Sequence, residues 1–138
     1  MNILGTTVEN KITSAETGGK YYAFEITIPP GEGVPPHIHT LEDEVLCMIN
    51  GELEVLLDGK PETATPGTVK NFPMGVPHGF QNNTDQPCSA IVLVTPGESF
   101  EQFFKELSEV SRGPETDMNE VVAITGKFGM TFVDSEEG

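Results

Sequence analysis

Three histidines and one glutamate lie in two short segments that are rich in glycine and proline. Residues 31–51 contain His37, His39 and Glu44, and residues 67–82 contain His78, so these segments hold all 3 histidines of the chain. Side chains two residues apart on an extended segment leave the same face. His37 and His39 can therefore bind one ion together, and we expect Glu44 and His78 to complete a metal site inside a β-barrel.

The ligand types indicate which ions such a site would take. Neutral imidazoles with a single carboxylate suit first-row transition metals and not calcium or magnesium. A closed structural zinc site would instead be expected to contain cysteines at short spacing. Four protein ligands leave one or two positions open on a five- or six-coordinate metal. We expect one divalent transition metal ion, with Fe as the first candidate and Mn, Ni, Co, Cu or Zn as alternatives.

Length and composition indicate a single β-rich domain. The chain has 138 residues, 15 Gly and 11 Pro, which is enough for one core and many tight turns. Its 7 basic and 22 acidic residues give a net charge of −15, which argues against nucleic-acid or anionic-membrane partners. No signal peptide or membrane-spanning stretch is evident, and two cysteines are too few for a disulfide framework. The expected location is cytoplasmic.

The strand pattern predicts a sandwich or barrel core over residues 21–95. Tyr22, Phe24, Ile26 and Ile28 alternate with polar residues as in a half-buried strand. Further strands are predicted at 44–49, 52–57, 68–72, 80–82 and 90–95, with no helices between them. Asn50-Gly51 predicts a two-residue hairpin between the strands 44–49 and 52–57, and Asp58-Gly59 turns the chain again. Residues 1–20 are expected to form an edge strand or an arm on a partner subunit.

The strand at 44–49 is apolar on both faces. Leu46 and Met48 share one face with Glu44, and the other face carries Val45, Cys47 and Ile49. A strand that is apolar on both faces is normally covered on both. A second subunit or the C-terminal helices are the two candidates for the outer cover.

Residues 98–128 are predicted to form a helical extension of the barrel. Phe100, Phe103, Phe104, Leu107 and Val110 fall at helical spacing, which indicates a helix packed on the barrel and not a partner-binding groove. A second helix is predicted with Thr116 or Asp117 as its cap, followed by Glu120. A last strand is predicted at 130–132, and residues 134–138 are expected to be disordered.

The two histidine segments resemble the cupin signature. The first cupin motif, G(X)5HXH(X)4E(X)6G, is matched by Gly31, His37, His39, Glu44 and Gly51, and the second, G(X)5PXG(X)2H(X)3N, by Gly67, Pro73, Gly75, His78 and Asn82. The resemblance implies a jelly-roll barrel (a double-stranded β-helix) in one cupin domain, usually homodimeric, with the metal held by the three histidines and Glu44. The C-terminal segment also looks similar to that of small bacterial quercetin-dioxygenase-like cupins.

Strand parity predicts which side chains line the pocket. Leu46 and Met48 share the Glu44 face, Phe80 shares the His78 face, and Phe72 and Met74 are expected nearby. The site would then be apolar apart from the metal, which suits a small aromatic or otherwise oxidisable molecule. Asn82 is expected to brace the loop beside the ligands and not to contact substrate.

These expectations favour a metal-dependent dioxygenase that binds a small organic substrate and O₂. By resemblance to quercetin dioxygenases, Glu44 would also act as a base on a substrate hydroxyl. The alternative is a non-oxidative small-molecule binder or an isomerase, in which the metal is structural or a Lewis acid. The sensor half of a transcription factor is disfavoured, because the chain has no room for a helix-turn-helix and is strongly acidic.

Overall fold

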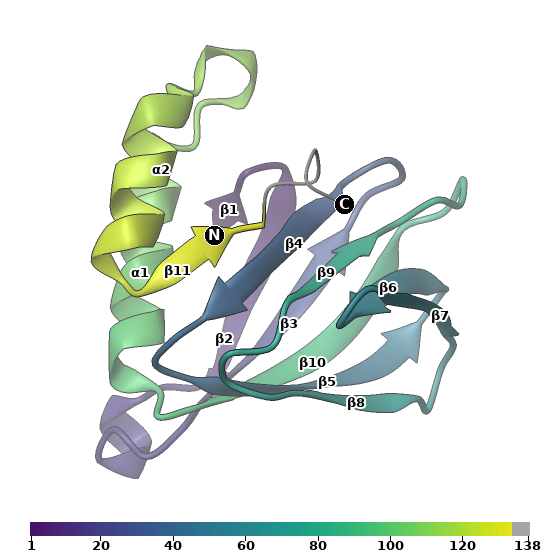
Figure 1. Ribbon diagram of the computed structural model, residues 1–138, viewed down its shortest axis with the longest axis horizontal. Helices are drawn as coiled ribbons and strands as arrows, with labels where there is room; N and C mark the ends of the chain where they lie inside the picture. Colours follow the sequence, from purple (N-terminus) through teal and green to yellow (C-terminus); the bar gives the residue numbers. More distant parts are fainter. Residues whose placement is uncertain (134–138) are drawn as a thin grey trace.

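Two antiparallel β-sheets face each other, and two helices lie along one side of them (Figure 1). The computed structural model describes residues 1–133, so the expected disorder at 134–138 lies outside the described residues. The first sheet has six strands in the order β1-β2-β3-β10-β5-β8. Its strands are β1 (Asn2–Ile3), β2 (Thr6–Ile12), β3 (Tyr22–Ile28), β10 (Cys88–Thr95), β5 (Asp43–Asn50) and β8 (Val69–Phe72).

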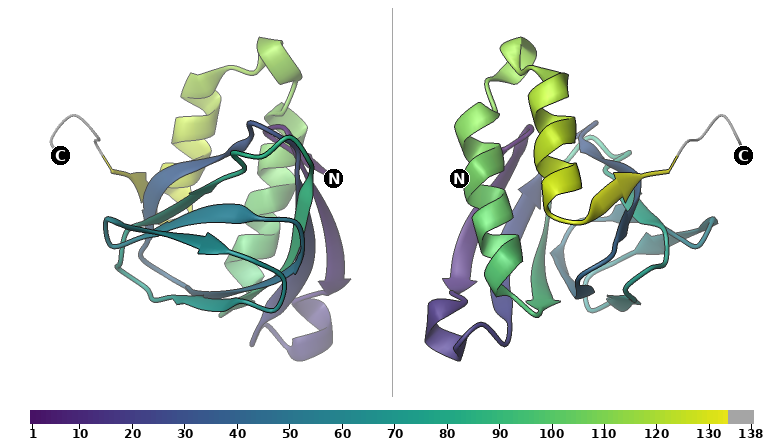
Figure 2. Two further views of the ribbon diagram at one scale, coloured as in Figure 1. Left: turned by 90° about the vertical axis from the view of Figure 1, so that its right-hand side faces the viewer. Right: turned by 60° about the vertical axis from the view of Figure 1, so that its left-hand side comes forward.

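The second sheet has five strands in the order β11-β4-β9-β6-β7. Its strands are β11 (Met130–Phe132), β4 (Gly33–His39), β9 (His78–Gln81), β6 (Leu53–Leu57) and β7 (Lys60–Ala64). Seen end-on in Figure 2, the strands surround an interior, and the helices stand beside it. The predicted fold class, an all-β jelly roll with C-terminal helices, is confirmed.

The predicted alternation in β3 is also confirmed. Tyr22, Phe24, Ile26 and Ile28 are all buried, and β3 pairs along its length with β10. Along β10 the buried residues again alternate with half-buried ones. The sheet therefore turns one apolar face toward the interior, as expected from hydrophobic burial with a period of two.

The hairpin predicted at Asn50-Gly51 is wrong. β5 and β6 belong to different sheets, so this turn carries the chain across the barrel. Gly51 is still required there, because its φ is +76° and a Cβ would lie 2.8 Å from the Cβ of Cys88. Asp58-Gly59 is the true hairpin: both residues have positive φ, and Leu57 pairs with Lys60. Turn chemistry predicts a reversal of direction, but not which strands then pair.

The C-terminal part forms α1 (Glu98–Val110), a 3₁₀ turn (Gly113–Glu115) and α2 (Met118–Lys127). Asp117 caps α2 by accepting a hydrogen bond from the Asn119 N–H, so Thr116 is not the cap. Figure 2 shows the two helices side by side, with β11 leading from α2 back to the barrel. A further 3₁₀ turn (Ala15–Thr17) joins β2 to β3.

The helices cover the inner face of the six-stranded sheet, where it extends past the smaller sheet. Phe104 of α1 meets Phe24 of β3 edge-on, with ring centroids 4.8 Å apart, and Phe100 stacks on Phe24. The suggestion that the helices cover the outer face of β5 is therefore wrong. On that face Ile49 remains 44% exposed.

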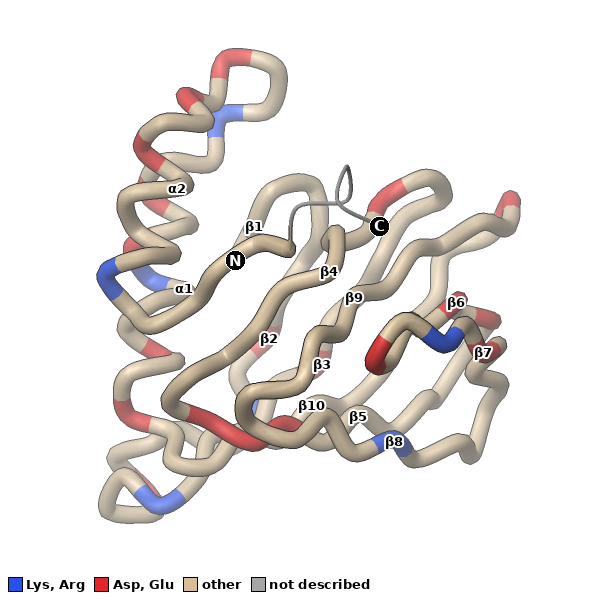
Figure 3. The backbone as a smooth tube through the Cα atoms, in the orientation of Figure 1, with Lys and Arg blue, Asp and Glu red and all other residues tan. Residues whose placement is uncertain are grey.

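Charge is distributed as expected for an acidic surface. Figure 3 shows Asp and Glu spread over helices, loops and the β6–β7 hairpin, with few Lys and Arg. Within residues 1–133, no helix has both the length and the apolar character needed to cross a membrane.

Candidate metal centre

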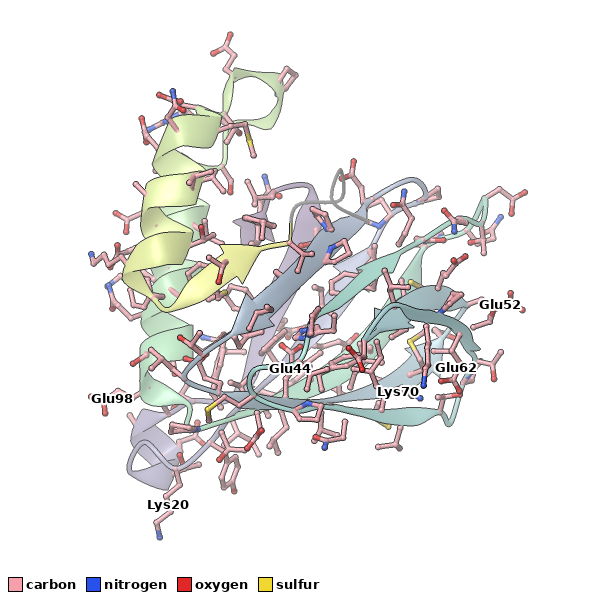
Figure 4. The ribbon with its side chains drawn as sticks, in the orientation of Figure 1. Lys20, Glu44, Glu52, Glu62, Lys70 and Glu98 are labelled. Atoms are coloured by element: carbon pink, nitrogen blue, oxygen red, sulfur yellow. The ribbon has the colours of Figure 1, made fainter. Side chains whose placement is uncertain are left out.

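The four predicted ligands come from both sheets. His37 and His39 lie on β4 and His78 on β9 in the smaller sheet, whereas Glu44 lies on β5 in the larger one. His37 and His78 are direct cross-strand partners, and all four residues are buried. Figure 4 shows Glu44 in the interior between the sheets. The two sheets thus present imidazoles and a carboxylate to the same space.

A glycine allows β4 and β9 to come close enough for this arrangement. A Cβ on Gly79 would lie 2.8 Å from the carbonyl oxygen of Val34 and 2.9 Å from the nitrogen of Pro36. The register of β4 shifts at this point, between Val34 and His37. The irregular, proline-containing part of β4 therefore packs directly on the β9 backbone, and this contact places His37 opposite His78.

The distances between donor atoms fit a shared cation. Nε2 of His37 lies 3.1 Å from Nε2 of His39, and Nε2 of His78 lies 3.1 Å from Oε2 of Glu44. The ligand atoms of the three histidines are all within 4.8 Å of one another. Two ligands bound at about 2.1 Å, at an angle of about 90–110°, would be roughly 3.0–3.4 Å apart. The three buried histidines could therefore bind a metal ion.

Hydrogen bonding and burial prepare His37 for this role. Its Nδ1 lies 2.9 Å from the carbonyl oxygen of Pro35, and since a carbonyl only accepts, Nδ1 carries the proton. In the neutral ring, Nε2 then offers a lone pair to the interior. Burial, followed by the nearby imidazoles of His78 and His39, lowers the pKa of His37 to about 4. His37 is therefore neutral near pH 7, as a ligand must be.

A second carboxylate, Glu42, lies behind His39. It is 1% exposed, and its Oε1 lies 3.4 Å from Nδ1 of His39. Neither atom has a hydrogen-bond partner that meets normal geometry. If the ring of His39 carries its proton on Nδ1, this N–H points to Glu42. The Nε2 atoms of His37 and His39 then direct their lone pairs at each other over 3.1 Å. A cation between the Nε2 atoms removes that conflict, so these buried polar groups fit a metal.

Sequence reasoning missed Glu42, which in isolation resembles part of a solvated acidic turn. The signal that could have found it is parity, because Glu42 and Glu44 are two residues apart and both are buried. Asp43 between them is exposed, and its carboxylate accepts a hydrogen bond from the Met74 N–H.

Glu44 is held as a carboxylate by its neighbours. Burial by itself would raise the pKa of Glu44, but the hydrogen bond from His78 and the adjacent imidazoles outweigh it, so the pKa is lowered. A cation that binds here would displace the proton that His78 shares with Glu44. The carboxyl group of Glu44 is thus ionised and can serve as a metal ligand or as a base.

A cavity of about 770 Å³ opens beside these residues. Leu46 and Phe80, two of the residues expected in the substrate pocket, line this cavity together with His37, His39 and Glu44. Three other residues expected in the substrate pocket, Met48, Phe72 and Met74, are not part of the lining of this cavity.

Each of these three residues lies elsewhere for a physical reason. Met48 is one step of the pleat beyond Leu46 and is buried in the core. Phe72 stacks flat on the ring of His78, with centroids 4.5 Å apart, and so holds the orientation of this proposed metal-binding imidazole. Met74 is 45% exposed on a loop.

Asn82 braces a loop and makes no hydrogen bond to the histidines. Its side-chain N–H groups donate to the carbonyls of Ile28 and Gln86, and its Oδ1 accepts from Thr84. The predicted bracing role therefore holds, but Asn82 is not attached to the metal ligands themselves.

More than half of the residues that line the cavity lie outside the predicted barrel core, residues 21–95. Phe103, Leu107, Val121 and Phe132 of the C-terminal segment line it, as does Ile3 of β1. The helices were predicted to pack on the barrel, and in addition they enclose the cavity.

Comparison with known proteins agrees with this arrangement. The family described as "Cupin domain" matches residues 24–100, which is more than half of the chain. The chain is a cupin. The first relative of this cupin among characterised proteins is a quercetin 2,3-dioxygenase from Bacillus subtilis, 33% identical over 61 residues. That match covers 42% of this chain and 18% of the relative, so the cupin spans less than a fifth of that protein's length.

Solved structures with the same fold carry several different names. The polyketide cyclase RemF from Streptomyces resistomycificus is 27% identical, with a TM-score of 0.60, over 68% of this cupin and 67% of that chain. A sugar phosphate isomerase of the cupin superfamily from Silicibacter pomeroyi is 25% identical, with a TM-score of 0.57, over 66% of this cupin and 59% of that chain. The fold is thus shared by proteins named for different reactions.

Proposed function

We propose that this cupin is a metal-dependent dioxygenase that acts on a small apolar or aromatic organic substrate. The observation that carries the proposal is a buried three-histidine cluster, of which His37 and His39 line one end of a largely apolar cavity. The likeness to quercetin 2,3-dioxygenase over 61 residues supports it. The wall contributes aromatic and aliphatic side chains, which suit an oxidisable organic molecule better than a sugar.

The residues of the chain have separate tasks in this reaction. His37, His39, His78 and Glu44 would hold the ion, and Fe is the first candidate. When bound, a redox-active metal supplies electrons and open coordination positions for substrate and O₂. Glu44, whose pKa is lowered, is present as a carboxylate and would accept the proton of a substrate hydroxyl. Leu46 and Phe80 would orient the substrate and exclude water from the reacting atoms.

An oxygen electrode tests this proposal. The protein is purified without a histidine tag, its metal content is measured, and Fe-, Mn- and Ni-loaded forms are mixed with flavonols, catechols and diketones. O₂ uptake that depends on both metal and substrate is expected for at least one combination. If none of the loaded forms consumes O₂, the dioxygenase assignment is wrong.

A non-oxidative reaction on a similar substrate is the second candidate. It is favoured by the likeness to a polyketide cyclase, at 27% identity. A sugar phosphate is a poorer fit, because no Lys or Arg lines the cavity within residues 1–133. Substrate conversion under strictly anaerobic conditions would support this candidate over the dioxygenase.

We also propose that the chain forms a homodimer through the outer face of β5, β10 and β8. The apolar residues on that face are Val45, Cys47, Ile49, Val69, Ile91 and Leu93. Val69 is 62% exposed, and the helices do not cover this face. A second copy could bury it.

The mass of the native protein in solution tests the dimer. Light scattering should give twice the chain mass, and Val69→Asp should shift it toward the monomer. A mass equal to one chain for the wild type would refute the proposal.

The proposed compartment remains the cytoplasm, because Cys47 and Cys88 are both free thiols.

A further inference from the structure

The cavity extends from the histidines into a space between the two helices and the N-terminal strand. We call this space the helical chamber and define it by six of its lining residues: Ile3, Phe103, Leu107, Met118, Val121 and Val122. The cupin match ends at residue 100, and Ile3 precedes its start. The cupin barrel alone therefore does not explain the chamber, which is formed largely by residues outside the matched region.

We propose that the helical chamber binds an uncharged aromatic body of more than one ring, which belongs to the same substrate whose oxygen atoms face the histidines. This inference rests on the proposed function for the end of the substrate that faces the metal. It adds that the C-terminal helices, and not the barrel, select the rest of the molecule.

Charge restricts what the chamber can hold. Within residues 1–133, the ionisable side chains that line the cavity, besides His37 and His39, are the carboxylates of Glu32 and Glu44. A phosphate or carboxylate on the substrate body would be buried with no cation to balance it, which is strongly unfavourable. The body of the substrate is therefore uncharged.

The aromatic side chains of the wall favour rings over an alkyl chain. Phe100 and Phe104 pack against Phe24 in stacked and edge-to-face geometry, at 6.1 Å and 4.8 Å between centroids. Phe103 meets Phe100 edge-on at 5.5 Å. Flat ligand rings can join such a network face-on or edge-on, and these contacts add to simple burial.

The size and the rim of the cavity agree with this ligand. A volume of about 770 Å³ is in the range that accepts drug-sized molecules and far exceeds a single ring. Met118, Val122 and Phe132 line the cavity, yet they are 58%, 57% and 42% exposed. Apolar side chains left in water beside an opening mark a path for an apolar ligand.

A series of hydroxamates with one chelating head tests the proposal in the zinc-loaded protein, which is redox-inert and separates binding from turnover. The probes are acetohydroxamate, with no body, octanohydroxamate, with an alkyl body, and 2-naphthohydroxamate, with a two-ring body. Calorimetry should show the naphthyl probe binding about 30- to 100-fold more tightly than the acetyl probe, from the added apolar burial. Equal affinities would overturn the proposal. Octanohydroxamate binding as tightly as the naphthyl probe would overturn its aromatic part.

Two matched variants locate the binding site of the body. Val122→Asp adds a carboxylate to the rim of the chamber and should weaken the naphthyl probe about tenfold, while acetohydroxamate changes less than about twofold. Ala123→Asp adds the same carboxylate at the next residue of α2, which is exposed and does not line the cavity, and should leave both affinities unchanged. If the two variants behave alike, the body does not lie in the chamber.

A metal-independent measurement distinguishes failure of this inference from failure of the proposed function. N-phenyl-1-naphthylamine, an uncharged fluorescent probe, should bind the metal-free wild type and bind Val122→Asp about tenfold more weakly. Absence of binding would overturn the chamber assignment even if O₂ uptake is found. Binding in the chamber without any O₂ uptake would leave this assignment in place and remove only the dioxygenase.

Discussion

The two ends of the cavity are built in different ways. At the metal end, His37, His39 and His78 are positioned by strand register and by a glycine contact, and His37 is also held by a hydrogen bond to a backbone oxygen. At the helical end, Phe103 and Val121 are positioned only by packing between segments far apart in the chain. The first construction specifies the position of individual atoms, whereas the second specifies only shape and polarity.

This difference separates chemistry from selectivity. The metal end buries polar groups that need a cation, because His39 and Glu42 leave polar atoms without partners. The helical end is apolar and needs only a ligand that displaces water. Substitutions at one end should therefore leave the property of the other end intact, and each prediction below tests that independence.

The largest effect is expected from His39→Ala, which removes one of three clustered imidazoles. Metal content should fall from about one ion per chain to near zero, because the remaining donors no longer surround the ion. The rise in melting temperature that metal addition gives the wild type should disappear with it. Binding of N-phenyl-1-naphthylamine at the helical end should persist. Elemental analysis, thermal unfolding and fluorescence measure the three properties.

Phe80→Leu is the matched control at the same end of the cavity. It changes a lining side chain that offers no ligand atom, so metal content should stay at the wild-type value. Full metal content in His39→Ala would contradict the ligand assignment.

The histidine cluster of the metal end could be predicted from sequence because its members lie in two motifs of fixed spacing. The spacing of His37 and His39 specifies one face of one strand, and the motif around His78 specifies the matching strand. Strand parity also placed Leu46 and Phe80 in the cavity wall. It did not place Met48 correctly relative to this cavity, since parity gives the face of a residue but not its depth along the barrel.

The helical end could not be predicted because it depends on long-range packing. The apolar stripe of α1 predicted a helix and a buried face, but not that the face would also enclose a cavity with β1 and α2. The turn at Gly51 failed for a similar reason. Its positive φ is a local property, whereas the choice of partner strand for β5 is decided by the whole sheet.

Phe103→Ala is the next largest test of the comparison, because it removes a buried ring at the helical end. Phe103 is 5% exposed and contacts Phe100, Phe104 and Phe128. The free energy of unfolding of the metal-free protein should fall by about 3–5 kcal/mol, measured by urea denaturation. Metal affinity of the folded fraction should change less than about threefold.

A milder variant keeps this test usable if Phe103→Ala is largely unfolded. Phe103→Leu retains most of the volume and should cost roughly 1 kcal/mol. If metal affinity falls in parallel with stability in both variants, the two ends are coupled and the comparison fails.

The smallest effect is expected from Glu42→Gln, which leaves every proposed ligand in place. The carboxylate of Glu42 faces Nδ1 of His39 at 3.4 Å, with both groups buried. A carboxylate that accepts the second ring N–H holds the imidazole in the metal-binding tautomer and makes it a stronger donor. Loss of such a group typically lowers metal affinity about 10- to 100-fold. Competition with a chelator should show that loss with normal folding.

The matched control is Asp43→Asn, which removes the same charge one residue away. Asp43 is exposed and accepts from the Met74 N–H, and an Asn oxygen can still accept that bond. Metal affinity should then change less than about threefold. Equal losses in the two variants would mean that Glu42 acts only through the negative field of the acidic segment. A loss confined to Glu42→Gln, together with unchanged binding of N-phenyl-1-naphthylamine by the metal-free protein, would show that a buried contact at one end of the cavity affects metal affinity alone.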